Sequence, residues 1–303
     1  MAARTERIVD TAHVQWRVEH QLIELPELDD LVVHYQPVVD LESERVVGFE
    51  ALVRWEHPRR GLLYPKDFLA IAEQSGFVPQ LGRRVGEIAV RQLADWQRAF
   101  PSEPGRWISV NVSAQGLCDS RIADGVRGAL DASDMDPSSL ILELTETVLL
   151  DVTPANTAKL EELKGIGVGL ALDDFGTGYA SLRYLRTFPF DYLKIDTSFT
   201  ADLPSEPRAM LLADSILQIA HTFGIIGIAE GIERQDQADC LMDMGWPLGQ
   251  GYLFARPAGS ETITAYLAAV STGFTRPRRH LGLVRGGRDF LGERGTRRPA
   301  PPR

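Results

Sequence analysis

The fold of this chain is decided by residues 165–196, which read GIGVGLALDDFGTGYASLRYLRTFPFDYLKID. A short apolar run, residues 168–172, ends in two adjacent acids, Asp173 and Asp174. A Gly-Thr-Gly turn follows, then a helical pattern, and then a second apolar run that carries Lys194. Short apolar runs that alternate with helical patterns are typical of βαβ units, and therefore predict a parallel sheet.

Asp173 and Asp174 are placed at the end of the first of these strands. In α/β folds the carboxyl ends of the strands form the rim where ligands bind and chemistry occurs. Two adjacent carboxylates repel each other unless a positive charge lies between them. A divalent metal ion is the usual source of that charge, and Lys194 is a second cation that we expect at the same place.

The bulk composition is that of an ordinary globular protein. The chain has 303 residues, of which 44% are hydrophobic and 24% charged, so it can form one barrel-sized domain or two smaller ones. No apolar run approaches the roughly 18 residues of a membrane span, and the N-terminus lacks the apolar core of a signal peptide. We therefore expect a cytoplasmic protein. Cys118 and Cys240 are too few for a disulfide framework and are expected to be inert thiols.

The charge is unevenly distributed along the chain. The net charge is −10, but residues 276–303 carry nine arginines against two acids, so the rest of the chain is strongly acidic. An acidic body does not suit a surface for duplex nucleic acid, and no DNA or RNA partner is expected. It does suit a site built from carboxylates that a metal ion neutralises.

Strand-like and helical segments alternate along most of the chain. The short connection between the first two strands predicts that they pair antiparallel. The expected strands are residues 31–39, 46–55, 107–112, 140–144, 168–172, 192–195, 225–229 and 251–254. The expected helices are residues 65–76, 79–99, 119–132, a stretch ending at 163, 179–186, 207–223, 233–244 and 261–270. Eight strands over about 250 residues predict a TIM-like (β/α)8 barrel, and an open doubly wound sheet is the alternative.

Acids, amides and one lysine recur where the predicted strands end. In a parallel barrel all these ends face one rim, so side chains from six or seven strands can converge there. The residues are Glu50, Asn111, Glu143, Asp173, Asp174, Lys194, Glu230 and Gln250.

Oxygen donors of this kind favour hard cations such as Mg²⁺ or Mn²⁺. His34, His57 and His221 fall at unrelated positions, so a zinc site is not indicated. Two cations ~3.5–4 Å apart would generate a hydroxide and hold both oxygens of an in-line displacement at phosphorus. Arg54, four residues after Glu50, suits bidentate phosphate binding, although a surface ion pair is the alternative for this residue.

Nine sequence blocks between residues 35 and 257 carry a family resemblance. In order they are YQPVVDL, GFEALVRWEHP, FLAIAEQSG, VNVS, ELTET, ALDDFGTGYASLRYL, DYLKID, IAEGIE and QGYLFARP. On these blocks the chain resembles the EAL-domain cyclic di-GMP phosphodiesterases from about Val14 to Ala269. The resemblance implies a TIM-like barrel whose first strand is antiparallel. It also implies hydrolysis of one phosphodiester of cyclic di-GMP to linear pGpG with two Mg²⁺ or Mn²⁺ ions, with Ca²⁺ inhibitory.

The resemblance also implies roles for single residues. The ligands of the first metal would be Glu50, Asn111, Glu143 and Asp173. Those of the second would be Asp173, Asp174 and Glu230. Lys194 would hold or deprotonate the attacking water, and Gln250 would orient water or substrate. The catalytic set is thus Lys194, Glu50, Asp173, Glu230 and Gln250. The substrate-binding set is Gln36, Leu52 and Arg54. The residues that support the loop after Asp174 are Glu146, Thr177 and Glu233.

In relatives, this loop and the next helix form a dimer contact, so a homodimer is expected. The predicted organisation is a flexible N-terminus at residues 1–13, an EAL phosphodiesterase domain at residues 14–272 and a basic, disordered tail at residues 273–303. We expect no attached sensor domain, because the barrel uses nearly all of this length. An active enzyme is the leading hypothesis, because every expected metal ligand is present. A non-catalytic cyclic di-GMP receptor or protein-interaction module on the same fold is the alternative.

Overall fold

The computed structural model describes residues 25–101, 105–150, 154–176 and 182–271. The predictions for the N-terminus, for a helical pattern through Val14, Val18 and Leu22, and for the tail at residues 273–303 lie outside these residues. Among the helices that are described, none is both long enough and apolar enough to cross a membrane.

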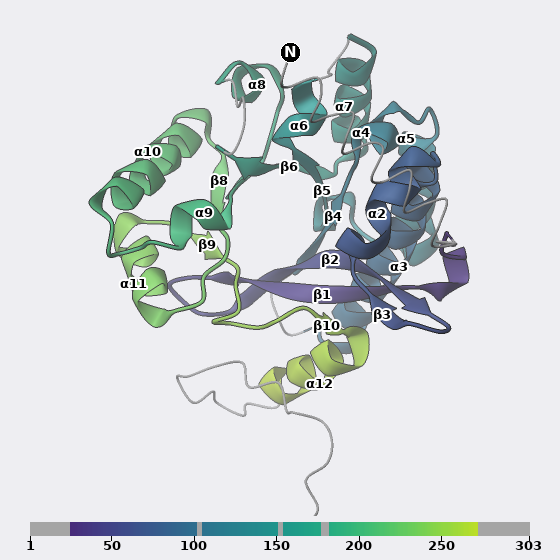
Figure 1. Cartoon of the computed structure of the whole chain (residues 1–303), viewed down its shortest axis with the longest axis horizontal. Helices are drawn as coiled ribbons and strands as arrows, with labels where there is room; N and C mark the ends of the chain where they lie inside the picture. Colours follow the sequence, from purple (N-terminus) through teal and green to yellow (C-terminus); the bar gives the residue numbers. More distant parts are fainter. Residues whose placement is uncertain (1–24, 102–104, 151–153, 177–181, 272–303) are drawn as a thin grey trace, which may run out of the picture.

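The centre of the molecule is a closed barrel of strands (Figure 1). The hydrogen-bonded order is β1-β9-β8-β7-β6-β5-β4-β2, and pairing of β1 with β2 closes the ring. All neighbours are parallel except β1, which is antiparallel to both β2 and β9. The barrel with an antiparallel first strand is thus confirmed, and the open sheet is excluded. The strands are β1 (Leu31–Asp40), β2 (Val46–His57), β4 (Trp107–Asn111), β5 (Leu140–Thr145), β6 (Gly169–Phe175), β7 (Tyr192–Ile195), β8 (Ile226–Ala229) and β9 (Leu248–Gly249).

Helices surround the barrel on its outside, and two short strands, β3 (Gly61–Leu63) and β10 (Ala258–Gly259), extend the sheet (Figure 1). The helices are η1 (Leu28–Asp30), α2 (Pro65–Gln74), α3 (Val78–Ala99), α4 (Ala114–Cys118), α5 (Ile122–Ser133), η2 (Pro137–Ser139), α6 (Glu146–Leu150), α7 (Pro154–Ile166), α8 (Leu182–Thr187), α9 (Thr197–Thr200), α10 (Pro207–Phe223), α11 (Gln235–Met244) and α12 (Ser260–Ser271).

Local chemistry accounts for where several helices begin and end. α2 and α10 begin with proline, whose missing N–H and fixed φ suit the first helical position. α10 ends at Gly224, whose φ of 69° is the left-handed conformation that glycine adopts without strain. The predicted helix at 119–132 is found as α5, and the short helix α4 before it was not predicted. The Ser113 side chain caps α4 by accepting from Gly116 N at 3.0 Å.

The hydrophobic core lies mainly between the outer face of the barrel and the helices. α3 buries one stripe of residues at helical spacing, including Leu81, Val85 and Ala89. Trp96 from the same helix packs edge-on against Tyr35, with ring centroids 4.9 Å apart. This packing leaves the strands' inward-facing side chains to form the interior and the rim.

The predicted strand at 251–254 is wrong. The last barrel strand is β9, and the chain turns directly after it, with Phe254 N donating to Gly251 O at 3.1 Å. A Cβ at position 251 would lie 2.1 Å from Ile232 O, so only glycine fits against this backbone. The apolar residues after Gly251 have the sequence pattern of a strand, but close contact with the backbone of Ile232 makes this segment a turn.

Candidate metal and substrate site

A bulge in β6 sets the geometry of the two adjacent acids. Leu172 pairs with Leu193 and Phe175 with Ile195, so Asp173 and Asp174 together oppose the single position of Lys194. Asp174 has a φ of 56°, in the left-handed region that non-glycine residues rarely enter. Its N–H donates to Asp173 Oδ1 at 2.9 Å.

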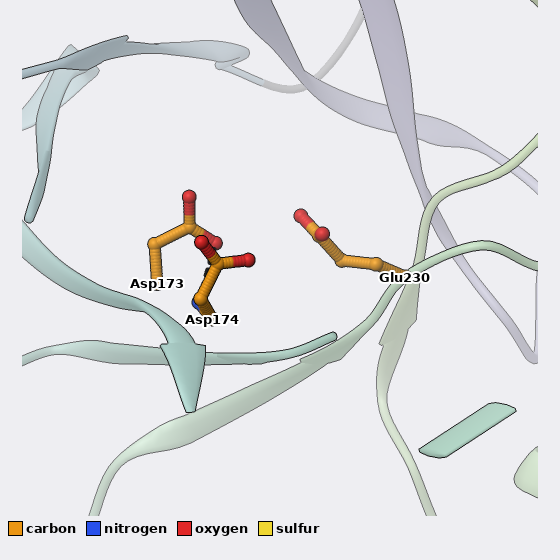
Figure 2. Close-up of side chains that lie close together, drawn as sticks. All are labelled: Asp173, Asp174 and Glu230. Atoms are coloured by element: carbon orange, nitrogen blue, oxygen red, sulfur yellow. Dashed lines mark hydrogen bonds between the residues drawn. The ribbon is translucent and has the colours of Figure 1, made fainter. Parts of the chain in front are cut away.

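Because of the bulge, the carboxylates of Asp173 and Asp174 lie side by side instead of pointing to opposite faces of the strand (Figure 2). Glu230 follows β8, the second strand along from β6, and points toward both aspartates (Figure 2). One oxygen from each of these three carboxylates lies within 4.8 Å of the others. Three convergent carboxylates are a suitable donor set for a hard divalent cation.

Lys194 is at the centre of the acidic cluster. Its side chain is only 1% exposed, and its Nζ lies among four carboxylates that come from four different strands or strand ends. The distances are 2.7 Å to Glu230 Oε1, 2.9 Å to Glu143 Oε2, and 3.5 Å to both Glu50 Oε2 and Asp173 Oδ1. The sequence prediction that Lys194 and the strand-end acids converge is therefore correct.

Burial and repulsion between neighbouring carboxylates raise the pKa values of Glu143, Asp174 and Glu230. Burial raises the pKa of Glu143 well above its usual value, against the opposing effect of Lys194. Burial likewise raises the pKa of Glu230 to about 8, and burial and the Asp173 charge raise the pKa of Asp174. One ammonium group does not balance this many carboxylates, so added positive charge would let them ionise together.

The pKa values of Glu50 and Lys194 are shifted in the direction opposite to the one that burial alone would give. Burial alone would raise the pKa of Glu50, but Lys194 and hydrogen bonds from Gln250 and Asn111 hold it below the usual value. Burial alone would lower the pKa of Lys194, but the surrounding carboxylates raise it well above the usual value. Glu50 is therefore a carboxylate and Lys194 an ammonium ion at neutral pH.

Amide side chains fix the carboxylate of Glu50. Asn111 Nδ2 donates to Glu50 Oε1 at 3.1 Å, and Gln250 Nε2 donates to Glu50 Oε2 at 2.7 Å. Gln250 Nε2 also lies 3.0 Å from Gln36 Oε1, and Gln36 Nε2 donates to Ala255 O at 3.2 Å. This chain of amides joins β1, β2, β4 and the residue after β9 into one wall of the site.

Arg54 lies on the same strand as Glu50 and is 6% exposed. Its Nη1 donates to Val53 O at 2.8 Å, and its guanidinium lies 4.9 Å from the centre of the Tyr64 ring. Within the described residues Arg54 makes no ion pair, and its buried Nε has no hydrogen-bond partner. The surface ion pair considered for Arg54 is therefore not seen.

The other predicted site residues are placed less centrally. Leu52 is half-buried on β2 between Glu50 and Arg54. Glu146 is buried at the first position of α6. Glu233 is exposed, and its N–H donates to Gln237 Oε1 at 2.9 Å. Thr177 lies outside the described residues, so the loop-support assignment of these residues stays a prediction.

Two contacts at the site were not foreseen. The Tyr64 ring lies against Arg54 because β3 pairs with β2 and returns the chain beside it; the Gly61 turn was the available signal for this hairpin. Thr200 Oγ1 donates to Glu230 O at 2.5 Å and so fixes the backbone that presents Glu230. Nothing in the sequence pattern pairs Thr200 with Glu230.

The fold and the site define an α/β barrel with a cluster of carboxylates around a buried lysine at its rim. The sequence matches the EAL domain family over residues 19–257. The chain therefore belongs to the EAL-domain family.

Curated relatives are longer proteins. The chain is 40% identical over 242 residues to the uncharacterized protein y4lL of Sinorhizobium fredii, covering 80% of this chain and 28% of that protein. It is 38% identical over 258 residues to the bifunctional diguanylate cyclase/cyclic di-GMP phosphodiesterase MucR of Pseudomonas aeruginosa (85% and 37%). It is 36% identical over 277 residues to the cyclic di-GMP phosphodiesterase NbdA of the same species (91% and 35%). The chain thus spans about a third of the length of these relatives.

Solved structures agree with the fold. The PaMucR phosphodiesterase in complex with c-di-GMP matches with a TM-score of 0.73 and 38% identity, covering 78% of this chain and 94% of that one. The EAL enzyme Bd1971, in its cAMP- and cyclic-di-GMP-bound form, matches with a TM-score of 0.79 and 30% identity, covering 88% and 73%.

Proposed function

We propose that this chain is a metal-dependent phosphodiesterase that hydrolyses cyclic di-GMP to linear 5'-pGpG and so lowers cyclic di-GMP signalling. The observation that carries the proposal is the convergence of Asp173, Asp174 and Glu230 within 4.8 Å, beside the buried Lys194. The relatives that are cyclic di-GMP phosphodiesterases support the substrate assignment.

The donor set fits two Mg²⁺ or Mn²⁺ ions, because every side chain in it offers oxygen. One ion would be held by Glu50, Asn111, Glu143 and Asp173, and the other by Asp173, Asp174 and Glu230. Such ions, when bound, activate water and neutralise charge that develops on the phosphodiester. The bulge at Asp174 lets Asp173 and its neighbour face the same site, which a regular strand would prevent.

Lys194 would position the attacking water. Its high pKa favours the ammonium form, which donates hydrogen bonds and does not abstract a proton. Bound cations would oppose this effect of the carboxylates, so Lys194 would hold or deprotonate the attacking water, as the family resemblance implies. Gln250, which is already hydrogen-bonded to Glu50, would orient water or substrate beside it.

The substrate would extend from the acidic cluster toward Arg54. The buried Nε of Arg54 has no partner among the described residues, so the guanidinium retains a donor for a phosphate oxygen. Gln36 and Leu52 would contact the guanine part of the ligand from β1 and β2. A cytoplasmic location and the absence of a nucleic-acid partner stay predictions.

Product analysis tests this proposal most directly. Purified protein is incubated with cyclic di-GMP and Mg²⁺ or Mn²⁺, and the nucleotides are separated by chromatography. We expect conversion to pGpG, loss of conversion with EDTA, and inhibition by Ca²⁺. Ligand that binds but stays intact with every metal would instead favour the non-catalytic receptor.

We also propose a homodimer through the loop and helix after Asp174. The helix is α8, the loop residues 177–181 lie outside the described residues, and we add α10 to this contact. The two helices follow one another around the barrel, with α8 at the top and α10 at the left of the view (Figure 1), and both expose large apolar side chains. Leu182 of α8 is 53% exposed, and Leu211 and Leu212 of α10 are 67% and 51% exposed. Leu211→Glu should shift the protein from dimer to monomer in analytical ultracentrifugation, whereas Leu62→Glu on β3 should not. A wild-type monomer at all concentrations would refute the proposal.

A further inference from the structure

A cavity of about 610 Å³ lies outside the barrel. It is bounded by the outer faces of β2, β4 and β5 and by α2, α3 and α5, which lie together in Figure 1. Its volume is within the roughly 300–1,000 Å³ that is typical of ligand pockets. The walls are aliphatic, and no aromatic side chain of the described residues lines them. Representative lining residues are Val53, Leu69, Val85, Val126, Leu142 and Val148.

Two glycines of α3 leave part of this cavity unfilled. Gly82 and Gly86 are both half-buried, yet a Cβ added to either would meet no neighbouring atom within 4 Å. Glycine inside a helix also destabilises it relative to alanine. The two glycines therefore make the helix less stable and less well packed than alanines would, and they leave space open beside the strands.

One cation at the wall of the cavity is available to a ligand. Arg83 of α3 is half-buried and makes no hydrogen bond or ion pair with another described residue, and its charge acts on the Asp119 carboxylate only at longer range. The other lining arginine, Arg121, is already bidentate with Asp119, at 3.1 Å for each of its two side-chain contacts. Two further lining acids, Glu73 and Glu87, lie on α2 and α3, and Glu87 contacts Arg84 at 3.8 Å. Among these groups, Arg83 is the cation left for an anionic head group.

We propose that this cavity binds an aliphatic carboxylic acid of medium chain length. The flexible chain would lie between the outer faces of the strands and the glycines of α3, where its methylene groups leave water. The carboxylate would accept hydrogen bonds from Arg83. A flat ring system is disfavoured because the described walls offer no aromatic stacking partner. The site lies behind the strands that carry Glu50 and Glu143, and its test does not depend on catalysis.

Calorimetric titration of the full chain with dodecanoate, below its micelle-forming concentration, tests the proposal. We expect saturable binding of one dodecanoate per chain. Gly86→Leu, which fills the cavity, should weaken this binding at least tenfold. The matched control is Gly128→Leu on α5, which is exposed and also has no atom within 4 Å of an added Cβ. Both variants should raise the melting temperature by removing a helical glycine, so that unfolding does not explain the loss.

The head group is tested with a second pair of variants. Arg83→Gln should weaken dodecanoate binding about tenfold, the loss expected for a hydrogen-bonded charge, and should leave the affinity for dodecanol unchanged. Arg91→Gln, at an exposed position of the same helix, should change neither. The proposal is overturned if the wild type shows no saturable binding or if Gly86→Leu binds as tightly as the wild type. Unchanged dodecanoate binding by Arg83→Gln would refute the carboxylate contact and so the proposed ligand class.

Discussion

The inner and outer faces of β2 and β5 are chemically opposite, although the residues that form them alternate along the same strands. Glu50 and Glu143 point inward to Lys194, whereas Ala51 and Leu142 point outward to the aliphatic cavity. Successive side chains of a strand face opposite sides, so a slip of one residue would exchange the two faces. The register of each strand therefore fixes the position of the acidic cluster and of the core at once.

The two faces should also differ in what they contribute to the protein. On the inner face, buried carboxylates are held by one lysine, an arrangement that contributes little to stability and serves the site. On the outer face, apolar burial stabilises the fold and no group is suited to chemistry. Substitutions on the two faces should therefore separate activity from stability, and this is what the following predictions test.

Glu50→Ala should have the largest effect, and on activity alone. It deletes a proposed metal ligand at the rim, so turnover of cyclic di-GMP should fall by roughly a thousandfold or more, while the circular dichroism spectrum stays that of the wild type. The control is Glu56→Ala, an exposed acid of the same strand, which should keep full activity. Substantial activity in Glu50→Ala would remove Glu50 from the site.

Lys194→Met should damage both activity and stability. The variant leaves Glu143 and its neighbours buried without their cation, which should lower the free energy of unfolding by about 3–5 kcal/mol. Added Mg²⁺ should restore part of the loss in urea unfolding. Lys164→Met is the control, because its ion pair with Asp191 at 2.8 Å is partly exposed and should be worth less than about 1 kcal/mol. An equally stable Lys194→Met would show that the carboxylates tolerate each other without this ammonium.

Much of the difference between the inner and outer faces can be predicted from the sequence. Apolar runs that end in Glu143, Asp173 and Lys194 predict both the barrel and the convergence of acids, because parallel strands share one rim. Antiparallel pairing of the first two strands follows from their short connection. These features depend on residues close together in sequence, which is why local patterns suffice.

Other features depend on contacts between distant residues, and these were missed or wrongly predicted. The turn after Gly251 depends on the backbone at Ile232. The bulge at β6 depends on a left-handed Asp174, a conformation that no residue pattern announces. The cavity beside Gly86 is a property of packing between helix and strand. Sequence periodicity predicts which face of a strand or helix a residue occupies. It does not predict how closely the neighbouring element packs against that face.

Leu142→Ala should affect the outer face alone. Leu142 is 4% exposed and points away from the acidic cluster. Its truncation should lower the free energy of unfolding by roughly 2–4 kcal/mol, measured in urea, while kcat for cyclic di-GMP stays within about twofold of the wild type at a temperature where the variant is folded. Met242→Ala, at an exposed position of α11, should leave stability nearly unchanged. A Leu142→Ala variant that is stable but inactive would contradict the separation of the faces.

The smallest expected effect is a pH dependence of stability that arises only on the inner face. Burial raises the pKa of Glu230 from 4.5 to about 8, and burial raises the pKa of Glu143 in the same direction. A carboxyl with a raised pKa holds its proton in the folded state, so its contribution to stability is complete below about pH 4.5 and is lost as the pH rises toward about 8. EDTA-treated protein should therefore be less stable at about pH 8 than at about pH 6 in urea unfolding. Saturating Mg²⁺ should reduce or reverse this slope, because it binds the ionised carboxylates.

Glu230→Gln should flatten the slope and Leu142→Ala should preserve it, since only the former removes a titrating group. A wild-type slope that is unchanged by Glu230→Gln would assign the pH dependence to residues outside the acidic cluster.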